Sequence, residues 1–304
     1  MSTRARFDVL SYGTIGMDII LQVPHWPSAD VSTHAVTSVE TMGGKAANTA
    51  THLAAWGYRV ALSGTIIGDD TMGNRAIAEL EKIDGIDAGF IERKPGLKSM
   101  YCVIFVRPDG ERAIVAVHTE GIIASPPTHE MITSARVLTL DLYGGDERVE
   151  AARLAHQHGI PVIVGDVRSF DHAVLPHTTI AIASQAELRQ SYPGLGAVEC
   201  GRRLVEAGAQ AAVLTDGPGE IMVLDMDGPV ARFRPPQVTP VDTTGAGDAF
   251  RAGVVFGWLK GFSTVRSAMV GAAAGSLAIE RIGAATEPPS PEEVLRLADG
   301  LSLA

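Results

Sequence analysis

A glycine-rich stretch near the carboxyl end of the chain holds the residues best suited to chemistry. Gly245, Ala246 and Gly247 form a tight turn, Asp248 follows at once, and an apolar run over 249–259 predicts a helix that begins there. The first N–H groups of a helix have no partner within it, and the helix dipole adds partial positive charge at that end. The pattern therefore predicts an anion site, for which phosphate is a typical ligand. An acid beside such a site indicates proton transfer during phosphoryl transfer.

Two common nucleotide-binding motifs do not fit this sequence. Gly44 and Lys45 look like the end of a P-loop, but Val39 stands where that motif has its first glycine, and Ala46 where it has Ser or Thr. The turn at 245–247 lacks the third glycine of the dinucleotide fingerprint and lies far from the first strand. Taken alone, this turn also fits a plain helix start stabilised by an acid, so the rest of the chain must decide.

The composition indicates a folded, soluble protein. The 304 residues, 46% hydrophobic and 20% charged, suit one large α/β domain or two small ones. A net charge of −10 without a basic patch argues against nucleic acid or an anionic membrane as a partner. The longest apolar run, 268–279, is too short to span a bilayer, and the N-terminus lacks an apolar signal core. Because Cys102 and Cys200 have no metal-binding spacing, we expect reduced thiols in a cytoplasmic protein.

Strands and helices alternate along most of the chain. This rhythm predicts an α/β fold, a three-layer α/β/α sandwich with a mostly parallel central sheet covered by helices on both faces. We expect strands over 7–12, 59–67, 137–142, 160–164, 180–183 and 210–215, with a hairpin over 221–224 and 230–234. We expect helices over 42–56, 71–82, 147–158, 196–207, 246–259, 263–279 and 291–298.

Four segments interrupt this rhythm and predict a second, smaller sheet. The segments 15–23 and 31–39 are more polar and irregular than buried parallel strands. The segments 99–106 and 111–117 flank a Pro-Asp-Gly turn at 108–110, which is typical of a β-hairpin. We expect all four to share one partly exposed sheet.

Motifs in a fixed order link these segments to a known family. Asp242 to Phe250 read Asp-Thr-x-Gly-Ala-Gly-Asp-x-Phe, and Gly43, Gly44 and Asn48 form a Gly-Gly pair followed by Asn in one helix. Further matches along the chain are Gly13 and Asp18, the Gly-Asp-Asp turn at 68–70, and Thr215 with Gly217. The chain resembles the PfkB family of carbohydrate kinases, the ribokinase and ketohexokinase type, over nearly its whole length.

The resemblance implies an ATP-dependent sugar kinase that phosphorylates a hydroxymethyl group of a ketose or pentose. Asp248 would be the general base that takes the proton of the attacking hydroxyl. The N–H groups of Gly245, Ala246 and Gly247 would form the anion hole for the transferred phosphoryl group. A helix N-terminus lowers the basicity of a carboxylate, but positioning matters more than base strength in a loose transition state.

The sugar side of such a site would consist of Asp18, Gly43, Gly44 and Asn48. A short acid and an amide suit the vicinal hydroxyls of a sugar, and paired glycines allow close approach. Asp18 could instead be a turn acid, and Asn48 a buried amide bonded to backbone. Lys45 faces either the sugar or solvent.

The nucleotide side would include Thr215, Gly217 and Gly219, with two departures from the family pattern. Gly219 comes one residue early, which puts the geometry of the phosphate-side loop in doubt. Ser184 stands where the family has Asn in Asn-x-x-Glu, while Glu187 fits the position that organises Mg²⁺ through water. ATP and Mg²⁺ are thus the implied cofactors.

Asp242 and Thr244 resemble a monovalent-cation site of ribokinase-like members, together with carbonyls over 278–283. This cation would be K⁺, and Thr244 would also adjoin the nucleotide. A capped strand end explains the same residues without an ion.

Arg251 is unusual, because this family position often carries a small polar residue. It lies three residues after Asp248 and could pair with it, reach a phosphate, or extend to solvent, which we expect. If it points into the site, an acceptor with its own anionic group becomes plausible. Asp166 and Arg168 follow a predicted strand and are further candidates, because ligands of parallel sheets bind at the carboxyl ends of strands.

The resemblance also implies a division of the chain and an assembly. The core would comprise 1–13, 41–97 and 115–304, and a β lid would comprise 14–40 and 98–114. A homodimer through the lid is expected. Two alternatives stay open: a nucleoside kinase, which needs an aromatic platform although aromatics are 5% of the chain, and a non-catalytic sugar- or nucleotide-binding regulator.

Overall fold

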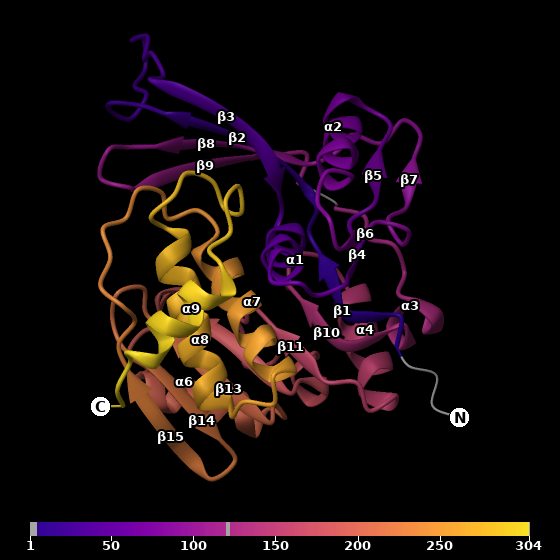
Figure 1. The fold of residues 1–304 in the computed structure, drawn as a ribbon, viewed down its shortest axis with the longest axis vertical. Helices are drawn as coiled ribbons and strands as arrows, with labels where there is room; N and C mark the ends of the chain where they lie inside the picture. The colour runs from indigo at the N-terminus through magenta and orange to yellow at the C-terminus, as the bar shows by residue number, and fades with distance from the viewer. Residues whose placement is uncertain (1–4, 120–121, 304) are drawn as a thin grey trace.

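A large, mostly parallel sheet forms the centre of the computed structural model, which describes residues 5–119 and 122–303 (Figure 1). Its strands are β1 (Phe7–Gly13), β4 (Val60–Gly64), β6 (Ile86–Asp87), β10 (Ala135–Leu140), β11 (Val162–Val164), β12 (Ile180–Ser184), β13 (Ala211–Thr215), β14 (Ile221–Asp225) and β15 (Gly228–Phe233). They are ordered β15-β14-β13-β12-β11-β10-β1-β4-β6. The two pairs made by β14 are antiparallel, and the other pairs are parallel.

Side chains of successive residues enter two separate hydrophobic cores, one on each face of this sheet. In β4, Val60 and Leu62 belong to one core and Ala61 to the other. In β13, Val213 and Leu214 divide in the same way. Strands buried on both faces need apolar residues at most positions, which is why they read as nearly continuous hydrophobic runs in the sequence.

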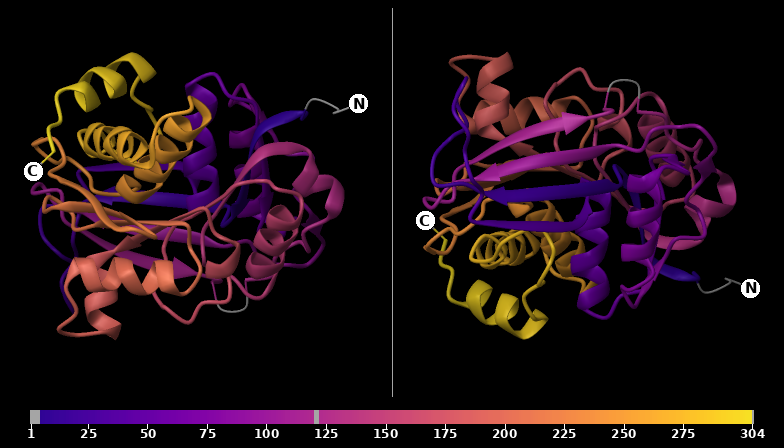
Figure 2. Two further views of the ribbon diagram at one scale, coloured as in Figure 1. Left: turned by 90° about the horizontal axis from the view of Figure 1, so that it is seen from below. Right: turned by 90° about the horizontal axis from the view of Figure 1, so that it is seen from above.

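Helices cover both faces and complete the predicted three-layer α/β/α sandwich (Figure 2). One layer contains α1 (Lys45–Ala55), α2 (Thr71–Leu80), α7 (Ala246–Leu259), α8 (Thr264–Ala278) and α9 (Pro291–Asp299). The other contains α3 (His129–Thr133), α4 (Glu147–Gln157), the 3₁₀ turn η1 (Leu175–His177), α5 (Gln185–Ser191) and α6 (Ala197–Glu206). The short helices α3 and α5 were not predicted.

The predicted second sheet is present as four strands in the order β3-β2-β8-β9 (Figure 1). They are β2 (Gly16–Gln22), β3 (Thr37–Gly43), β8 (Tyr101–Val106) and β9 (Arg112–Val117). The hairpin turn between β8 and β9 touches the segment that leads to α7, where Thr243 Oγ1 donates to Gly110 O at 3.3 Å. We call this sheet the lid; β3 and β9 continue past the limits at 40 and 114 expected from the sequence.

The strand expected over 31–39 is wrong in its position. β3 spans residues 37–43, and its partner β2 ends at Gln22, which pairs with Thr37. The chain before Thr37 therefore has no strand to join, and only a single bridge links Ser28 to Val31. Val31 and Val36 are 60% and 77% exposed, so no apolar contact holds them in a strand.

A third, two-stranded sheet is made by β5 (Ile67–Gly68) and β7 (Arg93–Lys94). Within residues 5–119 and 122–303, no helix combines the length and the apolar character needed to cross a membrane.

Helices α7 and α8 pack closely because glycines meet at their crossing. A Cβ atom added at Gly253 would lie 2.7 Å from Gly271 Cα, and one added at Gly271 would lie 2.7 Å from Phe250 O. The contact leaves no room for a methyl group, so it fixes α7, which carries Asp248, against its neighbour.

Gly253→Ala should lower the free energy of unfolding by about 1–3 kcal/mol, since an extra methyl group in a close-packed contact forces the helices apart. Chemical denaturation measures this change. Gly300→Ala is the matched control: Gly300 has a right-handed φ of −78°, and its added Cβ would lie 3.4 Å from Leu297 O, an ordinary contact. An equal loss in both variants would contradict the packing argument.

Candidate functional site

Two adjoining cavities lie between the lid and the N-terminus of α7. The first, of about 680 Å³, lies against lid residues such as Ile104 and Ile114. The second, of about 550 Å³, lies between the carboxyl ends of β12 and β13 and the start of α7. Four residues line both cavities: Lys45, Arg112, Gly245 and Asp248. The two cavities therefore meet at the turn that the sequence singled out.

The turn at the start of α7 requires glycine. Gly245 has φ +76°, a left-handed conformation that costs glycine little, and a Cβ atom there would collide with Ala284. Among the described residues no side chain caps this end of α7. The residues 245–248 line the second cavity, so unpaired N–H donors and the helix dipole are available to an anion there.

Asp248 is almost fully buried at this turn. Its Oδ2 accepts a hydrogen bond from Asn48 Nδ2 at 2.8 Å, which joins α7 to α1. Burial raises the pKa of Asp248 above its ordinary value, while the charges of Lys45 and Arg251 oppose the rise. Asn48 bonds a side chain here rather than backbone, and its Oδ1 is buried without a hydrogen-bond partner in the described structure. That oxygen can accept a hydroxyl donor from the first cavity, which Asn48 lines.

Asp18, from lid strand β2, lines the same cavity and is 5% exposed. Burial, reinforced by the charge of Asp248, raises its pKa to about 7, and a hydrogen bond from Cys102 works against the rise. The Asp18 carboxyl group occupies the space that a Cβ of Gly43 would need. Gly44 has φ +91°, and its Cβ would lie 2.5 Å from Thr14 O. The glycine pair thus brings Asp18 to α1, although Gly43 itself does not line the cavity.

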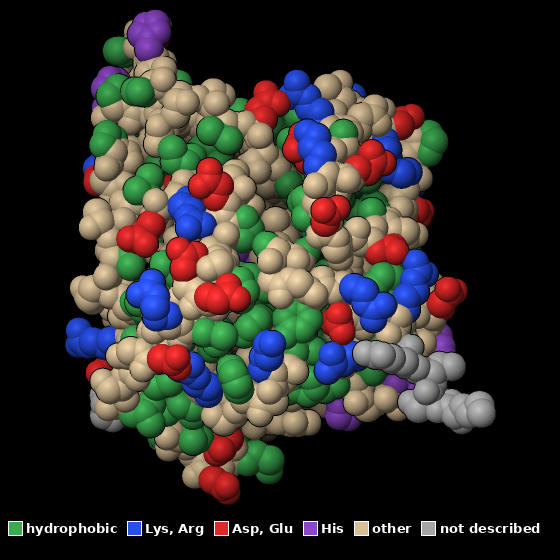
Figure 3. Space-filling view, in the orientation of Figure 1, with side chains coloured by type: hydrophobic (Ala, Val, Ile, Leu, Met, Phe, Trp, Pro, Cys, Tyr) green, Lys and Arg blue, Asp and Glu red, His purple; other side chains and the backbone are tan. Residues whose placement is uncertain are grey.

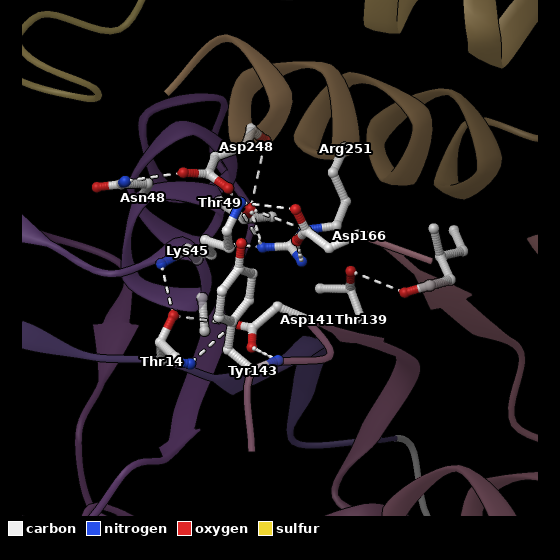
Figure 4. A network of polar contacts seen from close by, with 12 residues as sticks. Thr14, Lys45, Asn48, Thr49, Thr139, Asp141, Tyr143, Asp166, Asp248 and Arg251 are labelled. Carbon is white, nitrogen blue, oxygen red and sulfur yellow. Dashed lines mark hydrogen bonds and ion pairs between the residues drawn. The ribbon is translucent and has the colours of Figure 1, made fainter. Parts of the chain in front are cut away.

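Lys45 and Arg251 have well-defined partners inside the protein (Figure 4). Lys45 Nζ lies 2.6 Å from Asp166 Oδ1, so Lys45 faces the two cavities rather than bulk solvent. The expectation that Arg251 extends to solvent is wrong: its side chain is 2% exposed. Its Nη2 donates to Lys45 O at 2.7 Å and to Thr49 Oγ1 at 2.8 Å. The side chain is shielded from solvent because α1 packs over it.

Residues Asp166 and Arg168, which follow β11, occupy different surroundings. Asp166 lines the second cavity, whereas Arg168 forms a two-point ion pair with Glu187 at 2.8 and 3.1 Å. Arg168 also contacts the hydroxyl of Tyr143. Glu187 lines the second cavity with its partly exposed carboxylate.

Several residues on the nucleotide side of the prediction come together at the second cavity. Ser184, Thr215 and Gly217 line it, and Ser184 is the residue that precedes α5. Gly219 does not line it; its N–H instead donates to Asp216 O at 2.8 Å and closes a tight turn. The early glycine therefore closes a turn outside the cavity wall.

Asp242 lies behind the turn and is fully buried. Its two carboxylate oxygens accept the N–H groups of Thr244 at 2.8 Å and Gly283 at 2.9 Å. No described strand ends at Asp242, since β15 ends at Phe233, so these contacts order the loop before α7 and the expected capped strand end is not found. Thr244 Oγ1, however, is buried without a hydrogen-bond partner in the described structure, which leaves an oxygen donor for an ion. In the described residues no group of three His, Cys, Asp or Glu side chains has the geometry of a metal site.

Sequence reasoning missed Asp141, which orders the start of α1. This fully buried carboxylate accepts Thr14 N at 2.7 Å, Thr14 Oγ1 at 3.1 Å and Tyr143 N at 3.1 Å. Thr14 Oγ1 in turn accepts Lys45 N at 2.9 Å. The available signal was the position of Asp141 directly after β10, at the carboxyl end of a central strand. Arg112, which lines both cavities from the lid, was also missed, because nothing local marks a lid arginine.

Comparison with known proteins connects this geometry to a family. The family described as pfkB family carbohydrate kinase matches residues 6–291. A ribokinase of Bacillus subtilis is 26% identical over 94% of this chain and 97% of its own length. An ATP-dependent ribose-1-phosphate kinase of Halopiger xanaduensis is 28% identical over 92% of this chain and 94% of its own length. The structure of Arabidopsis thaliana ribokinase complexed with ribose and ATP has the same fold, with a TM-score of 0.79 and 23% identity over 96% of this chain and 98% of that one.

Asp18→Asn should stabilise the protein above neutral pH. Because the pKa of Asp18 rises from 3.8 to about 7 on folding, the native state binds a proton between these values that the unfolded state does not. Stability therefore falls as pH rises from about 4 to 7, by up to about 4 kcal/mol for this group. Chemical denaturation at pH 5 and pH 8 should show a smaller drop for Asp18→Asn than for the wild type. A larger drop, or an Asp18→Asn variant less stable than the wild type at pH 8, contradicts this account of the site.

Proposed function

Because the chain belongs to the pfkB family of carbohydrate kinases, whose members transfer phosphoryl groups from ATP, we propose that it phosphorylates a hydroxymethyl group of a ketose or pentose. One observation carries the proposal. Gly245 and Asp248 line both cavities, so a phosphate donor in the second and an alcohol in the first meet at the N-terminus of α7. A plain helix start with a stabilising acid does not explain two cavities that converge on that acid.

In the proposed reaction Asp248 is the general base. The hydrogen bond from Asn48 fixes its carboxylate, and its raised pKa, a consequence of burial, makes it a better proton acceptor than an exposed aspartate. The acceptor oxygen attacks the γ-phosphorus of ATP, the bond to ADP breaks, and the proton passes to Asp248. The N–H groups of Gly245, Ala246 and Gly247 stabilise the charge on the transferred group. The lid, over 14–40 and 98–114, excludes water, which would otherwise compete as acceptor.

The second cavity is the proposed ATP site, with Ser184, Thr215 and Gly217 along its wall and Gly219 next to the lining residue Pro218. Thr244 lines the first cavity, between two residues of the second-cavity wall in the sequence. Mg²⁺, held through water by Glu187, would neutralise the phosphate oxygens. The fit rests on a carboxylate that is partly exposed to the cavity while Arg168 fixes its orientation. Ser184 can donate or accept a hydrogen bond where the family has Asn.

A monovalent cation, K⁺, is proposed beside the turn at Asp242 and Thr244. The unpartnered Thr244 Oγ1 and the fully buried Asp242 carboxylate support it, since both are oxygen ligands. Such an ion would add positive charge close to the anion hole.

A sugar fits the first cavity better than a nucleoside does. Asp18 and Asn48 provide hydrogen-bonding groups for vicinal hydroxyls on one wall. The wall made by the lid is aliphatic, as at Met100 and Ile104, and among the lining residues Tyr143 alone is aromatic. Tyr143 is already occupied by Lys45 and Arg168, which lie over its ring at 5.0 and 4.6 Å.

An anionic sugar derivative is a further candidate acceptor, but the cations that would bind it differ from the one suggested by the sequence. Arg251, the residue that suggested it, directs its donors to α1 and does not line the first cavity. Lys45 and Arg112 are the cations that line it. A non-catalytic regulator is the other alternative, supported by the altered Ser184 and Gly219 positions.

We place the enzyme in the cytoplasm as a homodimer. ATP as donor and two free cysteines, Cys102 and Cys200, favour a reducing compartment. On the face seen in Figure 3, basic and acidic side chains are interspersed, which offers no single-sign patch to nucleic acid or membrane.

The dimer contact is proposed on the lid face opposite the first cavity. Cys102, Ile104, Ile114 and Ala116 line the cavity, and strand alternation turns their neighbours the other way. The neighbours pair across the sheet as Ile19, Val103 and Val115, and as Leu21, Phe105 and Ala113. All six of these apolar side chains are at least partly exposed, as an interface between two copies requires.

Asp248→Asn should lower turnover by about 10²–10⁴-fold, because the base is removed while the anion hole stays. ATP affinity, measured by calorimetry without acceptor, should change little. A variant that keeps wild-type turnover contradicts the assignment of the base, and a wild type that binds sugar and ATP without turnover favours the regulator.

Val103→Glu should convert the dimer to a monomer, since a buried unpaired charge is costly at an apolar interface. Light scattering after size-exclusion chromatography measures the mass of each species. Met226→Glu is the control, because Met226 is 82% exposed in the turn between β14 and β15, away from the lid. A wild type with the mass of one chain, or a Val103→Glu variant with the mass of two, rejects the proposed interface.

A further inference from the structure

Four charged side chains lie close together (Figure 4), and all four line the second cavity. Lys45 comes from α1, Asp166 from the loop after β11, and Asp248 and Arg251 from α7. Their side chains are 31%, 17%, 8% and 2% exposed, in that order. We call these four residues the charge cluster. Two cations and two carboxylates balance, so the cluster is neutral as a set.

The guanidinium of Arg251 is satisfied on one side only. Nε donates to Thr49 Oγ1 at 3.1 Å, and Nη2 donates to Thr49 Oγ1 and Lys45 O. Nη1 is buried and has no hydrogen-bond partner in the described structure. The nearest carboxylate oxygen to it in an ion pair is Asp166 Oδ2, at 3.9 Å, just beyond hydrogen-bond distance. An unpaired donor of a buried cation is costly, so a partner in another state of the protein is expected.

Asp166 is held between two cations at unequal distances. Its Oδ1 lies 2.6 Å from Lys45 Nζ, while its Oδ2 faces Arg251 Nη1. Its backbone has φ +60°, uncommon for a residue other than glycine, and the preceding Gly165 packs against Arg251, whose Cδ would lie 3.0 Å from an added Cβ. The loop thus places one carboxylate within reach of both cations.

Lys45 is the member of the charge cluster that can change partner. It lines both cavities, and its long side chain has the rotatable bonds needed to turn from Asp166 toward a phosphate at the α7 turn. To meet that phosphate, Lys45 must leave Asp166, and Asp166 would then be a buried carboxylate without a close partner. Arg251 Nη1 is the donor that can take its place.

We propose that Asp166 exchanges partners when ATP binds: Lys45 moves to the phosphates, and Asp166 closes onto Nη1 of Arg251. Arg251 lines the second cavity but not the first, and in this exchange it is a positioning residue that acts by holding Asp166 after Lys45 has left. The exchange rests on the proposed function only in placing ATP phosphates at the α7 turn.

Calorimetric titration with MgATP, without any sugar, tests the exchange. The variants are Asp166→Asn, Arg251→Met, Lys45→Met and the doubles Asp166→Asn/Arg251→Met and Asp166→Asn/Lys45→Met. Asp166→Asn should tighten ATP binding about tenfold, because Lys45 no longer has to leave a charged partner. Arg251→Met should weaken it about tenfold in the wild-type background and less than about twofold in the Asp166→Asn background.

The double variants distinguish exchange from a general attraction between positive charge and ATP. General electrostatics makes the effects of Arg251→Met and Asp166→Asn additive, and it keeps the effect of Asp166→Asn when Lys45 is replaced by methionine. The exchange requires that Arg251→Met lose its effect in the Asp166→Asn background. It also requires that Asp166→Asn lose its effect in the Lys45→Met background. Additive effects, a weaker ATP affinity in Asp166→Asn, or an undiminished effect beside Lys45→Met each overturn the proposal.

Asp8→Asn is the matched control, since Asp8 is 19% exposed, pairs with Arg136 at 3.1 Å and lies at the opposite end of β1. Its ATP affinity should equal that of the wild type.

Thermal melting checks each variant for folding. If Arg251→Met does not fold, the effect of Asp166→Asn with and without Lys45→Met decides alone. The titrations contain no acceptor, so they do not depend on the sugar-kinase proposal. A wild type that binds ATP but phosphorylates nothing refutes that proposal and leaves the double-variant comparison decisive for the exchange. A wild type that binds no ATP refutes the exchange as well.

Discussion

A hydrogen bond from Asn48 Nδ2 to Asp248 Oδ2 links the two helices on which the whole site depends, and bonds from Arg251 to Lys45 O and Thr49 Oγ1 reinforce the same contact. The bond between Asn48 and Asp248 spans 200 residues of sequence at 2.8 Å and lies in a buried region, where an unpaired amide or carboxylate would be costly. α1 follows the lid strand β3 directly, and α7 carries the anion-binding turn. The bond therefore ties the wall proposed for the acceptor to the turn proposed for the phosphate.

The site stores unfavourable energy that the surrounding fold offsets. Asp18 and Asp248 are both buried, both have raised pKa values because of burial, and nearby acids add to the rise in each. Two cations at 45 and 251 reduce this repulsion, and close packing of α7 on α8 keeps the helix in place. The hydrophobic cores on both faces of the central sheet stabilise the fold enough to offset the burial of these two acids. Because the burial itself is unfavourable for folding, we attribute it to ligand binding.

Much of the fold could be predicted from sequence because its signals are local. Apolar runs and the Pro-Asp-Gly turn act over a few residues, and they predicted the layers, the lid hairpin and a helix over 291–298. The structure shows that this helix, α9, begins with a capping box of Ser290 and Glu293, which is also a local feature. The strand predicted over 31–39 was misplaced, because the position of β3 is set by its pairing with β2. Residues close to β3 in the sequence carry no signal of that pairing.

The site also has residues that local motifs predicted and residues that they did not. Asp248, Gly245 and Asn48 belong to motifs that carry their own spacing, and the structure brings them together. The surroundings of Arg251 could not be read from the sequence, since they depend on the packing of α1. The place of Asp141 after a central strand was a signal, but it does not reveal the contact with Thr14. Thr49 lies 202 residues from Arg251 and Thr14 lies 127 residues from Asp141, and no periodicity connects them.

The most direct measurement of the central claim is ADP release from ATP in a coupled assay, with ketoses, pentoses, sugar acids, sugar phosphates and nucleosides offered in turn as acceptors. The account predicts that at least one ketose or pentose raises ADP release far above the rate with water alone, and that ³¹P NMR finds the phosphate on its hydroxymethyl oxygen. No stimulation by any acceptor, or stimulation by nucleosides alone, would contradict it.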